Sequence, residues 1–358
     1  MLKRIDIYII KKFLGTYFFA IALILGIAVV FDFQQKLDAF MKNEAPVDKI
    51  IFDYYFNFIP YFANLFSPLF VFIAVIFFTS KLADNSEIIA MLASGMSFNR
   101  LLRPYMISAG IIALITFILN SFIIPPANIT RIEFQNQYVR NKEQVYARNS
   151  QLMVEPEVIA YMERYDNTTK TGYRFSLERF EDKKLISRLT AKSVKYDSTY
   201  KWKIKDYMIR NFHGMEETIE KGAQMDTIIR FEPSDILISK YDNELMTTPQ
   251  LKAYIEKQRE RGVANIKSFE IEYHKRFAAV AASFILTAIG MSLSSRKVKG
   301  GMGLNIGIGL LLSFSYILFT TVSSTFAVTG KTSPLVAVWI PNMLYILIAI
   351  YLYWKAPK

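Results

Sequence analysis

The 358-residue chain is 52% hydrophobic and 15% aromatic, with a mean hydropathy of +0.22, a net charge of +12 and no cysteine. Several apolar runs approach or exceed the roughly 20 residues that cross a bilayer as a helix, so we expect an integral membrane protein. Without cysteine the chain forms no disulfide and no thiolate metal site. Its two histidines, His213 and His274, lack metal-ligand spacing, and we expect neither a catalytic nor a metal role for them.

The basic excess lies beside the apolar runs. Residues 131–270 contain 25 Lys and Arg against 22 Asp and Glu, whereas the rest of the chain contains 18 against 9. Basic residues that border membrane spans contact anionic lipid headgroups and fix the orientation of a membrane protein. We therefore expect no nucleic-acid partner.

The first apolar run, residues 13–31, follows a basic N-terminal segment. It is longer than the core of a signal peptide, and no small-residue cleavage site follows it. This pattern predicts a retained first span with its N-terminus inside the cell. A polar segment with Asp32, Lys36 and Lys42 follows on the far side.

A second span is expected at residues 51–79, bent by Pro60 and Pro68. The third span is expected at residues 104–124, ended on the far side by Pro125 and Pro126.

Residues 84–95, between these two spans, read DNSEIIAMLASG. Asp84 is placed to cap a helix, Glu87 to complete a capping box with it, and Gly95 to end the helix in a left-handed conformation. We expect a helix of about three turns lying at the membrane surface. Ile88, Met91 and Leu92 then form one apolar stripe, with Ser86 and Glu87 at its start. The pattern fits a helix that docks onto a partner, and it fits equally a surface helix that contacts nothing.

Residues 130–247 change character. Short alternating runs at 158–162, 173–177, 185–194 and 202–212 are separated by turn clusters. Period-two alternation of this kind predicts antiparallel strands with one buried face. We expect an inserted all-β domain, more consistent with a β-sandwich or jelly roll than with a closed barrel.

Thr248 and Pro249 are expected to open a charged helix that runs through Arg261 and stops at Gly262. Three further spans are expected at residues 277–293, 304–328 and 334–353. Gly303 and Gly307 form a G-x-x-x-G pattern, which allows another helix to approach closely. That helix could belong to a second subunit or to this chain.

These elements predict six spans and three regions. Residues 1–129 hold spans 1 to 3 and the surface helix, 130–247 the β-domain, and 248–358 a charged helix with spans 4 to 6. Positive charge orients this layout, because short inner loops carry more Lys and Arg than short outer loops. The expected inner residues are Lys3, Arg4, Lys11, Lys12, Lys81, Arg100, Arg103, Arg296, Lys297, Lys299, Lys355 and Lys358. The outer ones are only Lys36, Lys42, Lys49 and Lys331. Both termini are thus expected inside and the β-domain outside.

Across its whole length the chain resembles the LptF/LptG (YjgP/YjgQ) permeases of lipopolysaccharide export. The resemblance is carried by the basic first span, the Glu-x-x-x-Met-x-Ala-Ser-Gly pattern at residues 87–95, the Pro-Pro-Ala-Asn segment at 125–128, and three spans on each side of a β-domain. The β-domain matches in kind only.

The resemblance implies a subunit of an ABC-type exporter in the inner membrane of Gram-negative bacteria. Two such permeases form a hetero- or homodimer that extracts lipopolysaccharide from the outer leaflet and passes it to a periplasmic bridge of jelly-roll domains. A separate cytoplasmic ATPase dimer, which binds ATP and Mg²⁺, supplies the energy, so this chain is expected to be no enzyme and to bind no cofactor.

Carried over to this sequence, the resemblance assigns ATPase contact to Glu87 and its neighbours Ser86, Ile88, Met91, Leu92 and Gly95. It assigns Lys36 to the lipid phosphates, with Asp32, Lys42 and Arg131 as further candidates, although the family's arginine spacing is not clearly reproduced. An ordinary interfacial lysine is the alternative for Lys36.

Other functional classes remain open at this point. A non-transporting membrane scaffold or sensor, whose β-domain binds an envelope partner, is the main alternative. A MacB-like permease usually has four spans, with its domain after the first. A secondary transporter would need inverted repeats and ionisable groups at mid-membrane, and neither pattern is evident in the sequence.

Overall fold

The computed structural model describes residues 3–139, 146–214, 216–237, 242–260, 266–296 and 301–356. Two compact units are present. The helical unit comprises Met1–Val139, Glu244–Pro249 and Lys267–Lys358, and the β-unit comprises Arg140–Asn243 and Gln250–Ile266. The predicted helix end at Arg261 and Gly262, and the basic residues Lys297, Lys299 and Lys358, lie outside the described residues.

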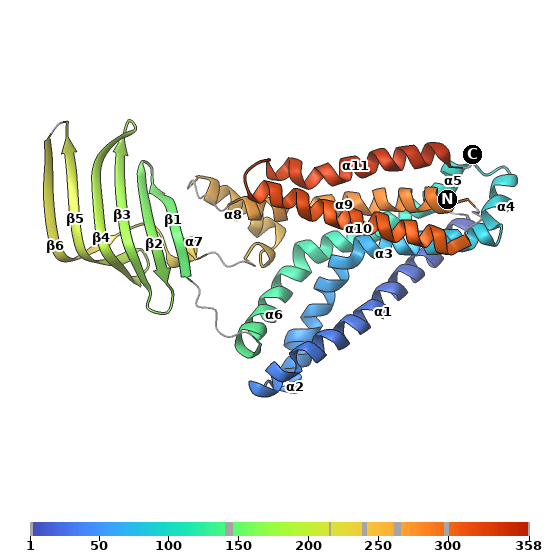
Figure 1. Ribbon diagram of the computed structural model, residues 1–358, viewed down its shortest axis with the longest axis horizontal. Coiled ribbons are helices and arrows are strands. Elements are labelled where there is room, and N and C mark those ends of the chain that lie inside the picture. Colours follow the sequence, from blue (N-terminus) through green and yellow to red (C-terminus); the bar gives the residue numbers. More distant parts are fainter. Residues whose placement is uncertain are drawn as a thin grey trace. The chain divides into compact units, whose positions relative to one another are not determined.

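Among the described residues, six helical segments are long and apolar enough to cross a membrane, which confirms the six predicted spans. The first three are α1 (Arg4–Lys42), then α2 (Val47–Lys49), η1 (Ile50–Tyr55) and α3 (Phe56–Asp84) in succession, then α5 (Phe98–Ile118), η2 (Leu119–Ile123) and α6 (Ile124–Tyr138). The last three are α9 (Lys267–Ser294), α10 (Gly301–Val328) and α11 (Pro334–Lys355). The short α4 (Glu87–Ala93) and both ends of the chain lie at one end of the helical unit (Figure 1).

The helix of the third span does not stop at Pro125 and Pro126, contrary to the prediction. The segment continues as helix to Tyr138, through the π-helical turn η2 and into α6. Both prolines lie in the first turn of α6, directly after η2. A proline is tolerated at that place because the wider π-turn and the new helix start do not need its missing N–H.

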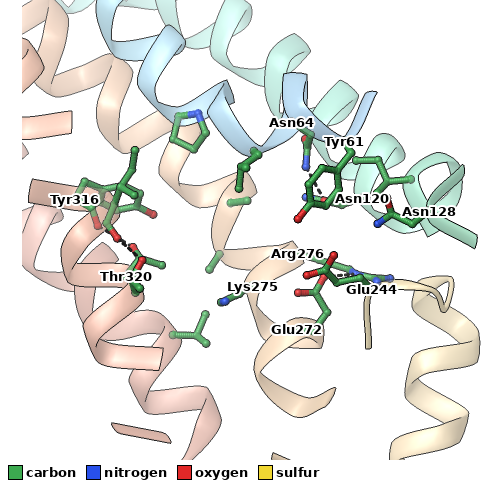
Figure 2. A pocket seen from close by; sticks show the side chains of 18 residues that line it. Tyr61, Asn64, Asn120, Asn128, Glu244, Glu272, Lys275, Arg276, Tyr316 and Thr320 are labelled. Carbon is green, nitrogen blue, oxygen red and sulfur yellow. Dashed lines mark hydrogen bonds and ion pairs between the residues drawn. The ribbon is translucent and has the colours of Figure 1, made fainter. Parts of the chain in front are cut away.

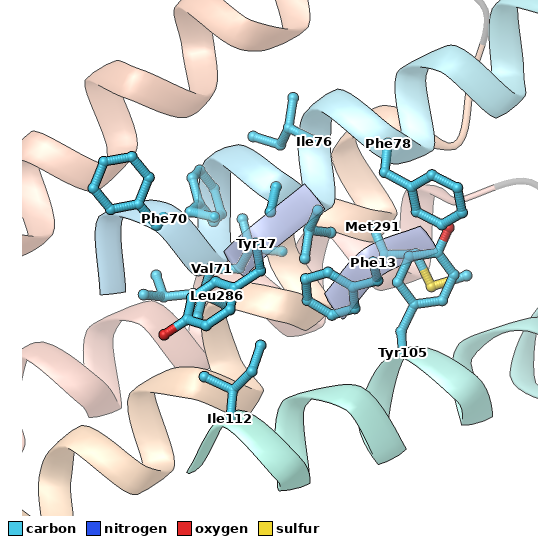
Figure 3. Close-up of a cluster of buried hydrophobic side chains, with 14 of the residues drawn as sticks. Phe13, Tyr17, Phe70, Val71, Ile76, Phe78, Tyr105, Ile112, Leu286 and Met291 are labelled. Atoms are coloured by element: carbon cyan, nitrogen blue, oxygen red, sulfur yellow. The ribbon is translucent and has the colours of Figure 1, made fainter. Parts of the chain in front are cut away.

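The largest apolar core of the helical unit joins α1 to other helices of the unit. Phe13 and Tyr17 of α1 pack among residues of α3, α5 and α9, including Val71, Tyr105 and Leu286 (Figure 3). The side chains that α1 contributes to this core recur every four residues and form one stripe: Ile9, Phe13, Tyr17, Ile21 and Leu25. The remaining faces of α1 and α10 expose large apolar side chains, among them Phe19 and Phe31 on α1 and Leu311 and Leu318 on α10.

Glycines on α10 fall into two groups. A Cβ at Gly309 would lie 2.2 Å from the side chain of Ile76, so Gly309 allows α10 to approach α3 closely. Around Gly303 and Gly307, in contrast, no heavy atom of the described residues lies within 4 Å of such a Cβ, apart from the neighbouring residues and backbone of α10 itself. The G-x-x-x-G pattern is therefore not used for packing within the described part of this chain.

The inserted all-β domain is confirmed, and its strands contain the four predicted runs. Six strands pair antiparallel, each with the next, in one sheet: β1 (Tyr146–Glu155), β2 (Val158–Asp166), β3 (Thr171–Glu181), β4 (Lys184–Ser198), β5 (Lys201–His213) and β6 (Glu216–Ile228). The consecutive order of the strands is visible in Figure 1. The alternation favours a β-sandwich or jelly roll with two packed sheets, whereas the described strands form one sheet. The buried face centres on Trp202, whose indole N–H donates to the carbonyl of Phe231 at 3.1 Å.

The chain after the sheet contains α7 (Pro233–Ile236), the short turn η3 (Asp242–Glu244) and α8 (Thr248–Glu260). The start of α8 at Thr248 agrees with the prediction from Thr248 and Pro249.

Candidate functional site

The surface helix α4 is shorter than predicted and begins differently. Asp84 is the last residue of α3 and so does not cap α4; Ser86 occupies the N-cap position with φ 60° and makes no side-chain cap bond. Only Asn85 and Ser86 separate the two helices, which leaves no room for the predicted capping box. The predicted stop is confirmed, because Gly95 has φ +86°.

The apolar stripe of α4 faces the chain's own core and not a partner. Ile88 is fully buried, and Met91 and Leu92 pack partly buried against the core of the helical unit. The opposite side, which we call the outer face of α4, exposes Ile89 (54%), Ala90, Ala93 and Ser94. The stripe thus attaches α4 to its own bundle, and the outer face is the part open to a partner.

An ion pair joins the start of α1 to the start of α5, the helix that follows α4. Arg100 Nη2 lies 2.5 Å from Asp6 Oδ2, and Asp6 is only 3% exposed. Asp6 also accepts the backbone N–H of Lys3 at 2.7 Å. Next to this pair, the hydroxyl of Tyr8 on α1 donates to Glu87 Oε2 at 3.4 Å. From the sequence, Arg100 is predicted only as a positive charge that orients the chain, and the ion pair is not predicted.

Lys36 lies in a polar cluster at the other end of the helical unit. Its ammonium contacts Asp32 Oδ1 and the hydroxyl of Tyr54, and it lies 4.7 Å from the centroid of the Tyr54 ring. Asp32 also accepts hydrogen bonds from Tyr54 at 2.9 Å and from Tyr55 at 3.2 Å. The charge of Lys36 is therefore already neutralised by Asp32. Lys42, the last residue of α1, is exposed.

Arg131 on α6 is buried. Its Nε donates to Asn128 Oδ1 at 3.1 Å, and its guanidinium lies 4.5 Å above the ring of Tyr61. One turn further along α6, the amide of Gln135 donates to Tyr54 at 3.3 Å. Helix α6 therefore connects Arg131 with the Lys36 cluster, although Arg131 does not touch Lys36 itself.

An apolar groove runs along the same end of α1. Its volume is about 610 Å³, and its walls are apolar side chains of α1 and of the segment that follows, including Val30, Phe33, Leu37, Met41 and Ile51. Such walls accept hydrocarbon chains.

A second cavity, of about 300 Å³, was not predicted, because its residues come from segments far apart in the sequence. It lies among α3, η2, α6, α9, α10 and α11, with Glu244 of η3 at one side (Figure 2). Its polar lining residues are Tyr61, Asn64, Asn120, Asn128, Glu244, Glu272, Lys275, Arg276, Tyr316, Thr320 and Thr321. Burial, followed by the nearby Glu272 carboxylate, raises the pKa of Glu244.

One comparison decides the family. Residues 7–355 match the family model described as lipopolysaccharide export system permease LptF/LptG. The chain belongs to the LptF/LptG family. No curated protein matches the chain.

Membership in the LptF/LptG family, with six apolar helices and an inserted antiparallel sheet, makes the chain a multi-pass inner-membrane protein and a permease subunit of lipopolysaccharide export. The family is one of transport subunits rather than known enzymes.

Proposed function

We propose that this LptF/LptG-family chain is one of two permease subunits in an ATP-driven exporter. It extracts lipopolysaccharide from the outer leaflet of the inner membrane and passes it to a periplasmic bridge protein of similar β-fold. ATP and Mg²⁺ bind to a separate cytoplasmic ATPase dimer. The observation that carries the proposal, beside the family match, is the outer face of α4: a small, exposed helical surface whose reverse side is packed into the bundle.

In this proposal both termini and α4 face the cytoplasm, and the β-unit faces the periplasm. The described basic residues near the α4 end of the bundle support this orientation, since Lys and Arg gather on the cytoplasmic side of inner-membrane proteins. The two termini and α4 lie at the same end of the helical unit (Figure 1).

The ATPase contacts α4 through Ser86, Glu87 and the outer face. Ile88, Met91 and Leu92 have a different role. They are packed into the core, so a displacement of α4 moves the bundle with it. Gly95 ends the helix and sets the direction of the chain into α5.

The lipid is bound at the other end. Lys36 offers a point charge for a lipid phosphate, and in the absence of lipid Asp32 holds that charge. A phosphate that approaches competes with Asp32 for Lys36, while Lys42 and Arg131 contribute further positive charge. The acyl chains follow the apolar groove beside α1.

A second permease subunit covers the exposed apolar faces of α1 and α10. Gly303 and Gly307 leave room beside α10 for a close helix crossing at that seam.

The proposal is tested by purifying the chain in mild detergent from its own host and measuring ATPase activity in the eluate. Ala93→Arg places a long cation on the outer face of α4 and is expected to reduce the co-purified activity at least tenfold. Ala253→Arg, the same change at an exposed position of α8, is the matched control and is expected to retain it. If the wild-type chain brings down no ATPase, the export mechanism lacks its energy source, and a membrane scaffold becomes the better description.

A further inference from the structure

The cavity among α3, α6, α9 and α10 contains buried polar atoms without partners. Asn128 is fully buried; its Oδ1 accepts from Arg131, while its Nδ2 has no hydrogen-bond partner among the described residues. Glu244 Oε2 is buried and equally unpaired within the described chain. A buried polar atom without a partner costs free energy, so one unpaired donor and one unpaired acceptor beside the same cavity indicate that a ligand or water completes them.

The charges around the cavity are of both signs, which disfavours a strongly charged ligand. The carboxylates of Glu244 and Glu272 disfavour an anion, and the cations of Lys275 and Arg276 disfavour a metal ion. Figure 2 shows Lys275 extending into the space between α9 and α10. A neutral group that both donates and accepts hydrogen bonds satisfies this mixed lining better than either ion.

Arg276 is not available for binding, because it holds the cavity in shape. It is 2% exposed and donates to Glu272 Oε1 at 3.2 Å, to Thr248 Oγ1 at 2.9 Å and to the carbonyl of Met246 at 2.9 Å. These bonds fix the Glu244–Pro249 segment on α9 and so place Glu244 at the cavity.

The remaining walls are aromatic and apolar. Tyr61 and Tyr316 lie at different sides of the cavity, and Leu65, Ala279 and Val338 line it between polar groups (Figure 2). A volume of about 300 Å³ is at the small end of ligand sites. Hydroxyl groups on a compact ring with apolar C–H faces match both the polar and the apolar parts of such a lining.

We propose that this cavity binds one uncharged sugar residue of a glycolipid headgroup, with Asn128 Nδ2 donating to one sugar hydroxyl and Glu244 Oε2 accepting from another. The inference rests on the proposed function in taking the sugar to be carried on a lipid. It adds a sugar subsite, separate from the Lys36 cluster, that lies within a single chain.

The test measures binding by the full chain alone, in nanodiscs of phosphatidylethanolamine and phosphatidylglycerol prepared without sugar detergents. Native mass spectrometry compares monoglucosyl diacylglycerol with diacylglycerol of the same acyl chains and with phosphatidic acid. We expect the glucosyl lipid to bind at least tenfold more tightly than either. Since no ATPase is present, the result does not depend on whether the chain couples to one, and a failure of export would leave it unchanged.

Two variants locate the binding. Asn128→Leu keeps the approximate side-chain volume but removes the amide, and is expected to abolish the preference for the glucosyl lipid. Glu244→Gln is the milder change and can be measured even if Asn128→Leu fails to fold. It is expected to weaken glucosyl-lipid binding at least threefold. Glu256→Gln, on the exposed side of α8, is the control and should have no effect.

Three results would overturn the inference. The glucosyl lipid and diacylglycerol could bind equally, as expected for a cavity that holds only water. Glu244→Gln could leave the preference intact, which would place the sugar elsewhere. Free methyl glucoside could bind as tightly as the glucosyl lipid, and the sugar would then not be lipid-borne.

Discussion

The two ends of the helical unit use polar residues in opposite ways. At the α4 end, an ion pair between Asp6 and Arg100 adds to an apolar attachment through Ile88. At the other end, Lys36, Asp32, Tyr54 and Tyr55 form a network in which each charge already has a partner. The first arrangement suits an element that moves as one piece with the bundle. The second suits a charge that is held until a competing ligand arrives.

The largest expected effect separates the two faces of α4. Ile88→Ala removes a fully buried side chain and should destabilise the protein by about 2–5 kcal/mol. Ile89→Ala, one residue later on the exposed side, should change stability by less than about 0.5 kcal/mol. Thermal unfolding in detergent, followed by tryptophan fluorescence, measures both. Equal effects of the two substitutions would contradict the packing of α4 described above.

The next largest expected effect on stability concerns the ion pair between Asp6 and Arg100 at the same end. Asp6→Asn and Arg100→Gln should each lower stability, because each leaves the other charge without its partner. In the Asp6→Asn/Arg100→Gln double variant, the two losses should be clearly less than additive. A double-mutant cycle of unfolding free energies measures this coupling, and strict additivity would show that the pair contributes nothing.

At the other end of the helical unit, removing Asp32 is expected to raise the affinity for a phosphorylated lipid. Asp32→Asn removes the carboxylate that neutralises Lys36, so affinity for a phosphorylated lipid A analogue should rise roughly three- to tenfold. Lys36→Gln should lower the same affinity. Titration with the analogue in nanodiscs provides the measurement. If Asp32→Asn weakens binding instead, Asp32 orients Lys36 for the lipid and does not compete with it.

The smallest expected effect concerns pH. Burial and the Glu272 carboxylate raise the pKa of Glu244 above its usual 4.5, so the folded state holds this proton more tightly than the unfolded state does. Stability from this group is therefore lost as pH rises from 4.5 through the raised pKa. Glu244→Gln should remove that loss, and its melting temperature relative to wild type should increase with pH. A difference that is constant across the pH range would show that Glu244 keeps its ordinary pKa.

The sequence was sufficient for the architecture because six apolar runs and one alternating region leave few arrangements open. It misjudged details that depend on packing partners. The stripe of Ile88, Met91 and Leu92 has the pattern of a docking surface, and only the fold reveals that the chain's own core covers it. Pro125 and Pro126 would end a helix unless a π-turn preceded them. No local sequence pattern predicts the π-helical turn η2.

The candidate sites were predictable to different degrees. Lys36 and Asp32 are four residues apart on α1, so their contact follows from helical spacing. Tyr54 and Gln135, which complete that cluster, are distant in sequence and could not be paired with it. The cavity lined by Asn128 and Glu244 draws on six helical segments and one short turn, and no sequence motif marks it.

The most direct test of the proposed coupling uses the absence of cysteine from the chain, since any introduced cysteine is then unique. Single variants Ile88→Cys and Ile89→Cys are treated in inner-membrane vesicles with a thiol-to-amine cross-linker, and the attached protein is identified by mass spectrometry. We expect Ile89→Cys to cross-link a cytoplasmic ATPase and Ile88→Cys to remain unmodified, because only the former is exposed. Reaction of Ile89→Cys with a membrane-impermeant maleimide added to the periplasmic side of intact spheroplasts would contradict both the orientation and the coupling.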